Sequence, residues 1–555
     1  MEDRGLDAYS WVTLVIFLLS IVPVIRPFKI PFFRQTHIRL NLATSPPLGV
    51  LILLIIRAIP ITTVRDGCIG SMGIQPYAIL ILFYSLAYIC ISLDLTGLFQ
   101  YLAFWVSRKA GNRGILAFTL FFCLTSLMSG LTSNDVVILT GTVFLSYFTR
   151  VSGINPTAFL VSEFTTANIA SMALYIGNPT NVIVSEAYDI SFIEYSAWML
   201  LPTVVTLLLA YCVLRVMFNN PVYLPRQIVA PDASPNSVLL DPKGAVFGTV
   251  LLACCLATLV GTSFAGVSVW MVTLPFAVVT LVRDFLYDLG SIKWMHSNNG
   301  LSTVTGSIDI DIDISTSSTV NNGTIDSIDR TRRSSRGSLS NRSIGLQSLP
   351  ATRAETAPRE TVGLHRSFQR RLGQRIKRLG YRWPTVFAVI QRMPWAILPF
   401  SLGMFVLVEG LSLVGWVGVL AKGLVVFTLN YVTAVYGVTF VSIVACQLLN
   451  NLPMTILLTR IIQHPNFSSR VTSPVIMQGV LLGLIVGSNL GACLTLVGSL
   501  AGIMFDHILK SKNIHVLGYR NFLGWNLILL PVLALGASSV IIGELWFIYQ
   551  RSKGF

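Results

Sequence analysis

Four short polar sequences interrupt long apolar stretches of this chain, and they hold the side chains best suited to bind a small solute. They are Thr132-Ser133-Asn134-Asp135, Gly177-Asn178-Pro179-Thr180-Asn181, Asn450-Asn451-Leu452-Pro453-Met454-Thr455 and Gly487-Ser488-Asn489-Leu490-Gly491. Asn offers both a carbonyl oxygen and an NH₂ group, and Ser and Thr hydroxyls donate or accept hydrogen bonds. Gly and Pro break helices. A half-helix that begins at a break presents its positive dipole end, which suits oxyanions, whereas unwound carbonyls suit cations or neutral hydroxylated solutes.

The polar side chains of these breaks are the predicted substrate- or ion-binding residues. They are Thr132, Ser133, Asn134, Asp135, Asn178, Thr180, Asn181, Asn450, Asn451, Thr455, Ser488 and Asn489. A single break in a membrane helix is often only a kink or an interhelical hydrogen bond. Four breaks that are paired between two halves favour a binding site. No catalytic residue, metal ligand or cofactor is expected, since no Walker A loop, zinc motif or nucleophile elbow occurs.

Two acidic residues in apolar segments are candidates for binding a coupling proton or cation. Asp135 adjoins Asn134 at the first break, and Glu163 precedes the second. An acid inside a membrane indicates function, because its burial is costly. Arg460 is expected either to extend to the membrane surface or to pair with an acid. Cys446 and Cys493 suit a thiol-seeking metalloid, although small buried residues are the commoner interpretation.

The composition places these breaks in a membrane protein. Of 555 residues, 53% are hydrophobic and only 11% are charged, whereas about 25% are charged in a soluble domain. So few charged groups cannot cover a soluble globule, but a bilayer solvates apolar side chains. The sequence therefore predicts a multi-pass integral membrane protein, in the plasma membrane rather than an internal one, and it excludes a soluble enzyme.

Ten apolar runs are close to or longer than the roughly 20 residues that a helix needs to cross a bilayer. They lie near 9–26, 47–64, 76–97, 157–190, 195–218, 245–263, 267–284, 385–408, 471–505 and 521–548. Two further apolar stretches, 113–150 and 425–463, are interrupted by polar residues near the middle. We expect each of these two to be a re-entrant hairpin, which enters the membrane and returns to the same side.

The two halves of the chain resemble each other. Similar spacings separate Asp94, Asn134 and Asn178 in the first half and Glu409, Asn451 and Asn489 in the second. The predicted fold is an all-α polytopic membrane protein, an inverted repeat of two halves, each with five spans and one re-entrant hairpin. In such repeats the substrate site lies where the halves meet, near the membrane midplane.

The predicted organisation has four parts. Residues 1–218 form the first repeat, with hairpin 113–150 and broken helix 157–190; 219–284 begin the second repeat; 285–384 form a disordered basic cytoplasmic loop; and 385–555 complete the second repeat, with hairpin 425–463 and broken helix 471–505. The loop is rich in Ser, Thr, Asn and Arg, and it cannot bury enough apolar area to offset its ordering entropy.

The basic charge of the chain is concentrated in this loop. Residues 330–382 contain fourteen Lys and Arg and two acids, a net charge of +12 out of +15 for the whole chain. A positive loop beside a membrane usually stays in the cytoplasm. The basic charge therefore does not indicate nucleic-acid binding.

Five stretches of the chain resemble the arsenical pump membrane protein family, within the wider ion transporter superfamily. They are ISLDLTGLFQYLAFWVSRKAGN (91–112), SGLTSNDVVILT (129–140), PWAILPFSLGMFVLVEGL (394–411), LLNNLPMTILL (448–458) and GSNLGACLTLVGSLAGIMF (487–505). The resemblance covers nearly all of the chain except 285–384. It implies a metalloid or ion exporter, driven by proton exchange or by an attached ATPase subunit. It also implies an elevator-like motion of the hairpin-bearing part against a scaffold, with the hairpin tips at Asn134 and Asp135 and at Asn450 and Asn451.

The residues and the resemblance together predict a secondary active transporter that exports arsenite, antimonite or a similar small inorganic solute, coupled to a proton or cation gradient. The alternatives on the same scaffold are a sodium/proton antiporter and a silicate or carboxylate anion carrier. A channel or a non-transporting membrane protein is a third alternative, which an inverted repeat disfavours. The expected partners are the small-molecule or ion substrate and the lipid bilayer. A homodimer and an ATPase subunit are left open, and no nucleic acid is expected.

Overall fold

The computed structural model describes residues 6–32, 36–70, 73–229, 235–297, 380, 382–471 and 473–551. Most of the predicted disordered loop, 285–384, lies outside these residues. The chain forms two compact units, and the first comprises Met1–Asp288 and Trp383–Phe555. The second unit, Leu289–Arg382, is described only at the end of one helix and at residues 380 and 382.

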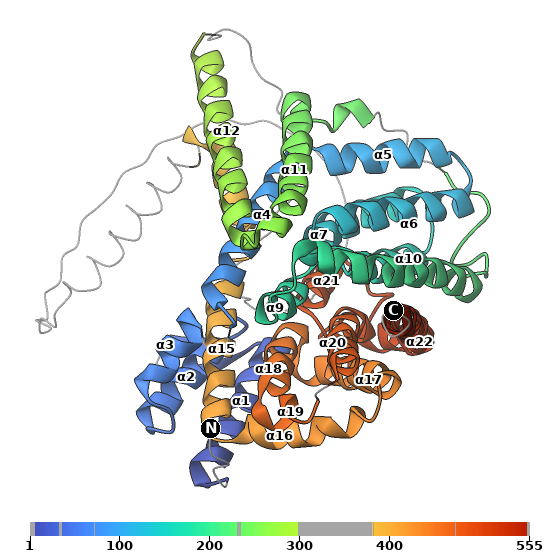
Figure 1. Cartoon of the computed structure of the whole chain (residues 1–555). Coiled ribbons are helices and arrows are strands. Elements are labelled where there is room, and N and C mark those ends of the chain that lie inside the picture. Colours follow the sequence, from blue (N-terminus) through green and yellow to red (C-terminus); the bar gives the residue numbers. More distant parts are fainter. Residues whose placement is uncertain are drawn as a thin grey trace, which may run out of the picture. The chain divides into compact units, whose positions relative to one another are not determined.

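The first half of the chain is a succession of helices with one small β-hairpin (Figure 1). Its elements are α1 (Ala8–Ile25), β1 (Phe28–Phe32), β2 (Thr36–Leu40), α2 (Ser45–Ile55), α3 (Ile61–Ile69), α4 (Pro76–Leu95), α5 (Leu98–Ala110), α6 (Gly114–Leu131), α7 (Asn134–Val151), α8 (Thr157–Ala170), η1 (Tyr175–Gly177), α9 (Pro179–Ala187) and α10 (Phe192–Met217). The two strands pair in antiparallel register, with Phe28 opposite Leu40.

The second half is also helical. Its elements are η2 (Pro235–Ser237), α11 (Pro242–Thr262), η3 (Ser263–Ala265), α12 (Val269–Ser297), α14 (Pro384–Arg392), α15 (Ile397–Leu413), α16 (Trp416–Leu424), η4 (Val425–Phe427), α17 (Tyr431–Leu449), α18 (Asn451–Gln463), α19 (Pro465–Ser468), α20 (Pro474–Leu494), α21 (Leu500–Ser511) and α22 (Tyr519–Arg551). Proline stands at the first or second position of α11, α14 and α20, where a missing N–H costs nothing.

Within the described residues, ten helices are long and apolar enough to cross a membrane. They are α1, α4, α6, α10, α11 with η3, α12, α14 with α15, α17, α20 and α22. The prediction of an all-α polytopic membrane protein is therefore confirmed. The inverted orientation of the two halves stays a prediction. The re-entrant path of the hairpins also stays a prediction, and their first arms, α6 and α17, are long enough to cross a membrane.

One predicted span is wrong. The apolar run 47–64 is not a continuous helix but the two short helices α2 and α3. Between them, Arg57 has a positive φ of 56°, and Pro60 precedes α3 with extended backbone. A left-handed residue followed by a proline ends a helix whatever the hydropathy of its neighbours.

Most helices of the first unit can be assigned to two groups, which contact each other through α15 and α18 and through α4 and the helices α7 and α9. The framework consists of α1 to α4, α11, α12, α14 and α15. In the framework, α2 and α3 pack on α15, and α11 and α14 pack on α4.

The hairpin group consists of α6 to α10, α17, α18 and α20 to α22. In it α8 packs between α6 and α10, α20 packs between α17 and α22, and α22 packs on α10. The arms α7 and α18 pack on α21 and α9, each in the other half of the chain.

Three of the four predicted breaks occur where expected. Helix α6 ends at Leu131 and α7 begins at Asn134, while α8 and α9 are separated by a short turn and η1. Helices α17 and α18 meet at Asn450, whose φ is 71°; Asn adopts positive φ more readily than most residues. Each break therefore starts a half-helix whose first N–H groups have no partner within the helix.

The fourth predicted break is wrong, because α20 continues through Gly487–Gly491 and ends at Leu494. Four glycines follow one another at every fourth position of α20: Gly479, Gly483, Gly487 and Gly491. A Cβ on Gly487 would lie 2.4 Å from the Cβ of Ser442 in α17. The glycines thus permit close packing of two helices, as small residues do in membranes. The chain breaks instead at Thr495–Ser499, before α21.

Candidate functional site

The two halves of the chain meet in a buried group of polar side chains, which we call the junction cluster. It consists of Ser171, Asn178, Thr180, Asn181, Ser488 and Asn489. The Nδ2 of Asn178 donates to the Oδ1 of Asn489 at 2.8 Å. The Nδ2 of Asn489 in turn donates to the Oδ1 of Asn181 at 2.8 Å. A single Asn of α20 therefore binds two Asn side chains at the start of α9.

Local structure positions each of these groups. Asn178 caps α9, with its Oδ1 accepting from the backbone N–H of Thr180 at 3.2 Å. The hydroxyl of Ser488 donates to the Oγ1 of Thr180 at 3.2 Å, and alternatively to the carbonyl of Ile485. All six side chains are at most 1% exposed. Because buried polar groups are costly unless paired, this pairing fixes the geometry of the cluster.

The first hairpin tip is linked to the junction cluster through α8. The Nδ2 of Asn134 donates to the Oδ1 of Asn168 at 3.0 Å. The hydroxyl of Ser171 reaches the backbone carbonyl of Asn168 at 2.9 Å and the Oδ1 of Asn489 at 3.3 Å. The sequence prediction missed Asn168 and Ser171. The sequence held a signal for both residues, because one amide and one hydroxyl side chain occur in the otherwise apolar segment 167–174.

The second hairpin tip lies against the segment between α20 and α21. The Nδ2 of Asn450 donates to the carbonyl of Val497 at 3.1 Å, and the backbone N–H of Asn451 donates to the carbonyl of Gly498 at 2.9 Å. No hydrogen bond among the described residues joins Asn450 or Asn451 to the junction cluster. Among the described residues, the first tip is thus linked to the junction cluster through Asn168, and the second tip has no such link.

Two residues that the sequence prediction missed support the second tip. The Nε2 of Gln447 donates to the carbonyl of Gly491 at 2.8 Å, and the Oγ1 of Thr495 donates to the Oε1 of Gln447 at 2.6 Å. Gln447 lies in α17 and Thr495 just beyond α20. The amide of Gln447 in an apolar helix was the available signal in the sequence. Its partner Thr495 is 48 residues away and cannot be identified from the spacing of residues.

Two predicted hydroxyls bond within their own helices. The Oγ1 of Thr132 donates to the carbonyl of Met128 at 2.7 Å, and the Oγ1 of Thr455 donates to the carbonyl of Asn451 at 2.8 Å. Such bonds leave the oxygen lone pairs available but occupy the hydroxyl hydrogen. Thr132 and Thr455 are therefore placed to accept rather than donate a further hydrogen bond.

Both hairpin tips carry an amide oxygen with no partner. Among the described residues, the Oδ1 atoms of Asn134 and Asn450 are buried and accept no hydrogen bond. Asn134 is 2% exposed and Asn450 is 0% exposed. A buried unpaired carbonyl oxygen is costly, and a cation or a hydroxyl donor would satisfy it.

A crevice opens beside the first tip. Its polar lining residues are Ser133, Asp135 and Arg392, and α9 contributes Pro179 and Val182. The other lining residues are all apolar: Ile79, Leu82, Phe83, Leu86, Ala87, Ile91, Val136, Leu139, Ile176, Pro394 and Met504. The predicted coupling acid, Asp135, and the start of α9 therefore line the same crevice.

The second predicted coupling acid occupies a different environment. Glu163 is 2% exposed on α8, and the Oγ1 of Thr142 donates to its two carboxyl oxygens at 3.0 and 3.3 Å. A Cβ on Gly141 would lie 2.7 Å from its Oε1. Glu163 does not line the crevice. Of the two acids, Asp135 is thus the one that a solute in the crevice would contact.

The two cysteines near the second-half breaks are buried. The Sγ of Cys446 lies 3.9 Å from the carbonyls of Gly487 and Ser488, and the Sγ of Cys493 lies 3.8 Å from the carbonyl of Asn489. Cys446 of α17 therefore packs against the backbone of α20 beside the junction cluster, and Cys493 lies one turn beyond Asn489 on α20. Among the described residues there is no group of three His, Cys, Asp or Glu side chains arranged to hold a metal ion.

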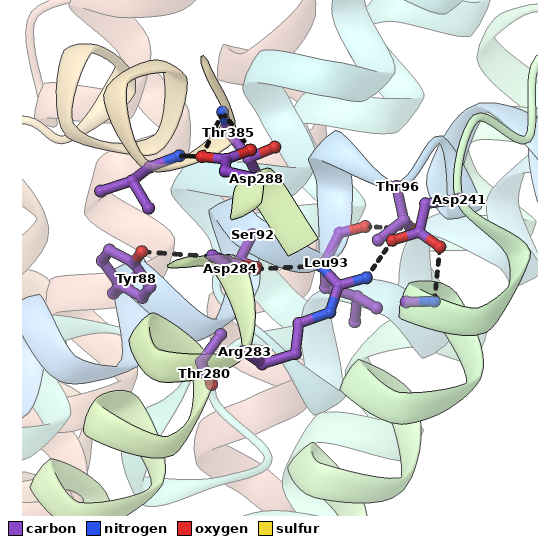
Figure 2. A network of polar contacts seen from close by, with 12 residues as sticks. Tyr88, Ser92, Leu93, Thr96, Asp241, Thr280, Arg283, Asp284, Asp288 and Thr385 are labelled. Atoms are coloured by element: carbon purple, nitrogen blue, oxygen red, sulfur yellow. Dashed lines mark hydrogen bonds and ion pairs between the residues drawn. The ribbon is translucent and has the colours of Figure 1, made fainter. Parts of the chain in front are cut away.

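The framework contains a second polar group that the sequence prediction missed (Figure 2). Asp284 of α12, which is 0% exposed, accepts hydrogen bonds from Tyr88 at 3.2 Å, Ser92 at 3.0 Å and Arg283 at 3.0 Å. Arg283 also pairs with Asp241, which caps α11. One turn further along α12, Asp288 accepts from the backbone N–H groups of Thr385 and Val386 at the start of α14. These contacts tie α4, α11, α12 and α14 together.

Ten candidate spans, and two halves that meet in a buried polar cluster, define a polytopic membrane protein of the transporter type. Residues 8–295, slightly more than half of the chain, match the family model described as citrate transporter. Residues 382–543 match the one described as arsenical pump membrane protein. The chain belongs to the citrate transporter family, and the predicted resemblance to arsenical pump membrane proteins is confirmed.

Similar proteins are transporters. The arsenical pump membrane protein of Escherichia coli (strain K12) is 23% identical over 456 residues, which cover 81% of this chain and 83% of that protein. The one of Yersinia enterocolitica is 22% identical over 455 residues with the same coverage. An uncharacterized transporter of Mycobacterium tuberculosis (strain ATCC 25618 / H37Rv) is 29% identical over 166 residues, 30% of this chain and 37% of that protein. The crystal structure of the Alcanivorax borkumensis YdaH transporter has a TM-score of 0.49 and 13% identity, covering 98% of both chains.

Proposed function

We propose that the chain is a secondary active transporter that exports a small, uncharged, hydroxylated inorganic solute such as arsenite or antimonite, coupled to a proton or cation gradient. The observation that carries the proposal is the junction cluster, in which Asn489 of one half binds Asn178 and Asn181 of the other. Substrate sites of transporters with repeats lie where the repeats meet. When a solute binds, its hydrogen bonds would replace the Asn–Asn bonds and open the contact between the halves. When the solute leaves, the Asn–Asn bonds would form again and close it.

The chemistry of the cluster favours a neutral solute. Arsenite at neutral pH is an uncharged trihydroxide, and its hydroxyl groups both donate and accept. The side chains of the cluster are all amides or hydroxyls, which also donate and accept. A multiply charged anion would need Arg or Lys close by, because burying its charge unpaired is costly. The names of the relatives in Escherichia coli and Yersinia enterocolitica support the same solute class.

Coupling is assigned to the first hairpin tip. Asp135 lines the crevice and can exchange a proton with water there. The unpaired Oδ1 of Asn134 lies on the neighbouring residue and offers a ligand to a cation. Proton or cation binding at Asp135 would neutralise its charge before the tip moves through an apolar environment.

One observation favours a second candidate, a carboxylate anion carrier. Arg392 lines the same crevice, and a guanidinium is the usual partner of a carboxylate. Its Nη1 donates to the Oδ2 of Asp94 at 3.1 Å, so an anionic substrate would have to share it. The match of residues 8–295 to the citrate transporter family supports this candidate as well.

Reconstitution of the full chain in liposomes separates the two candidates. The uptake of arsenite, antimonite, silicate, sodium and citrate is measured with and without an imposed pH gradient, and each is offered as a competitor of the others. We expect arsenite or antimonite flux that follows the pH or cation gradient and that citrate does not compete. Saturable citrate flux without arsenite flux would reject the leading proposal in favour of the carboxylate carrier.

A further inference from the structure

The framework holds itself together by its own buried polar contacts. Asp284 and Asp288 of α12 bind α4 and α14, respectively (Figure 2). Arg283 extends the same network to Asp241 at the start of α11. Buried, charge-assisted hydrogen bonds of this kind are the strong ones. The framework therefore has the bonding expected of a body that keeps its shape.

In the first half, the framework contacts a hairpin arm through Asp94 near the end of α4. The Oγ1 of Thr140 on α7 donates to the Oδ1 of Asp94 at 3.2 Å. The ion-pair partner of Asp94 is Arg392, which belongs to the framework helix α14. Among the described residues, the framework is thus joined to the arm α7 by one hydrogen bond, which comes from a neutral hydroxyl.

In the second half, the corresponding contact is an ion pair. The Nη2 of Arg460 on α18 lies 2.9 Å from the Oε2 of Glu409 on α15. The side chains are 5% and 14% exposed, respectively. A buried ion pair is weak evidence for net stability, but removing one partner leaves a charge in a poorly solvated site. The framework therefore contacts the second hairpin arm through an ion pair, whereas it contacts the first through a neutral hydroxyl group.

We propose that Glu409 and Arg460 are a positioning pair that holds the second hairpin on the framework and so determines how often the hairpin group leaves the arrangement seen here. The inference rests on the proposed function, since it requires the hairpin group to move against the framework during transport. Translocation then requires this ion pair to separate or to rotate with the motion. Loosening the pair changes the populations of the conformations, because an equilibrium shifts by the difference in free energy between its states.

Thiol labelling of the crevice tests this without any substrate. The reporter is Leu139→Cys, which lines the crevice, in a chain whose exposed Cys123, Cys212 and Cys254 are replaced by Ser. The labelling rate with a membrane-impermeant reagent is measured in proteoliposomes. We expect Glu409→Gln and Arg460→Gln each to change the labelling rate at least threefold, and the charge swap Glu409→Arg with Arg460→Glu to restore most of it.

Two further variants complete the test. Asp506→Asn removes the acid from the exposed Lys510 pair of α21 and should leave the labelling rate unchanged. The double variant Glu409→Gln with Arg460→Gln removes both charges of the pair, so it leaves neither one buried alone. It should give the same change in labelling, and it replaces the single variants if those lower the yield of protein. Equal labelling rates in the wild type and in this double variant would show that the pair only holds helices together and would overturn the proposal. Absence of arsenite flux in the wild type would instead bear on the proposed function, because labelling needs no substrate.

Discussion

The side chains of Asn178 and Asn489 are joined by a hydrogen bond of 2.8 Å although they are 311 residues apart in the sequence. Asn178 stands at the start of a half-helix, whereas Asn489 lies within the continuous helix α20. The bond therefore joins an unwound segment of one half to a rigid helix of the other. A solute that enters between the halves must compete with this bond.

Replacing Asn489 by Ala should reduce arsenite flux more than tenfold. The substitution leaves the amides of Asn178 and Asn181 with a lost partner in a fully buried site, at a cost of about 1–3 kcal/mol for each. The matched control is Asn526→Ala, because Asn526 is also 0% exposed but, among the described residues, its side chain bonds only to the carbonyl of Phe522 in its own helix. The measurement is flux per inserted protein in liposomes. Equal flux in both variants would remove the junction cluster from the transport pathway.

Replacing Asp135 by Asn should abolish the response of flux to a pH or cation gradient while the protein still inserts. Asn has nearly the same shape but no titratable proton, so the crevice keeps its form. Asp66→Asn is the control, since the Asp66 side chain is 37% exposed and pairs with its neighbour Arg65. The gradient dependence of solute flux is compared in the three proteins. Unchanged coupling in Asp135→Asn would exclude this acid and direct attention to Glu163.

The sequence predicted most of the elements but not how the polar residues pair. Hydropathy identified most of the spans because burial in lipid requires long apolar helices. It failed at 47–64, where Arg57 and Pro60 interrupt the apolar run. It also misread Gly487 and Gly491 as a break, because glycine permits close helix packing as well as unwinding.

The partners within the candidate site could not be predicted for a related reason. Asn178, Asn181 and Asn489 were identified by residue type, but their mutual bonds depend on how two distant halves dock. The repeat spacing equated Asn178 with Asn489, yet the first caps a half-helix and the second does not. Asp284 was overlooked because it ends an apolar run and looks interfacial in sequence, although it is fully buried.

Replacing Gly141 by Ala should destabilise the protein by about 1–3 kcal/mol, as overpacking of a core usually does. The new Cβ would lie 2.7 Å from the Oε1 of Glu163, so the carboxyl group would have to move away from Thr142. Gly130→Ala is the control, since its Cβ would lie 3.7 Å from the nearest atom, the carbonyl of Ala170. Thermal unfolding in detergent is measured for both variants. A further test adds Glu163→Ala, in which Gly141→Ala should cost less; an undiminished cost would refute the steric explanation.

Replacing Asp284 by Asn should lower the thermal stability of the framework but leave the flux of each folded molecule close to that of the wild type. The carboxylate accepts from Tyr88, Ser92 and Arg283, and an amide NH₂ in its place would face donors. The loss of a charge-assisted bond and the unsatisfied donors together cost about 1–3 kcal/mol.

The control for Asp284→Asn is the same change at Asp506, an acid on α21 whose side chain is 31% exposed. Unfolding temperature and arsenite flux are measured on the same preparations, so that stability and transport are separated. A lower unfolding temperature with normal flux per folded molecule would place Asp284 in a body that does not change during the transport cycle. A loss of flux without any loss of stability would contradict that assignment, because it would mean that the bonds of Asp284 change as the solute crosses.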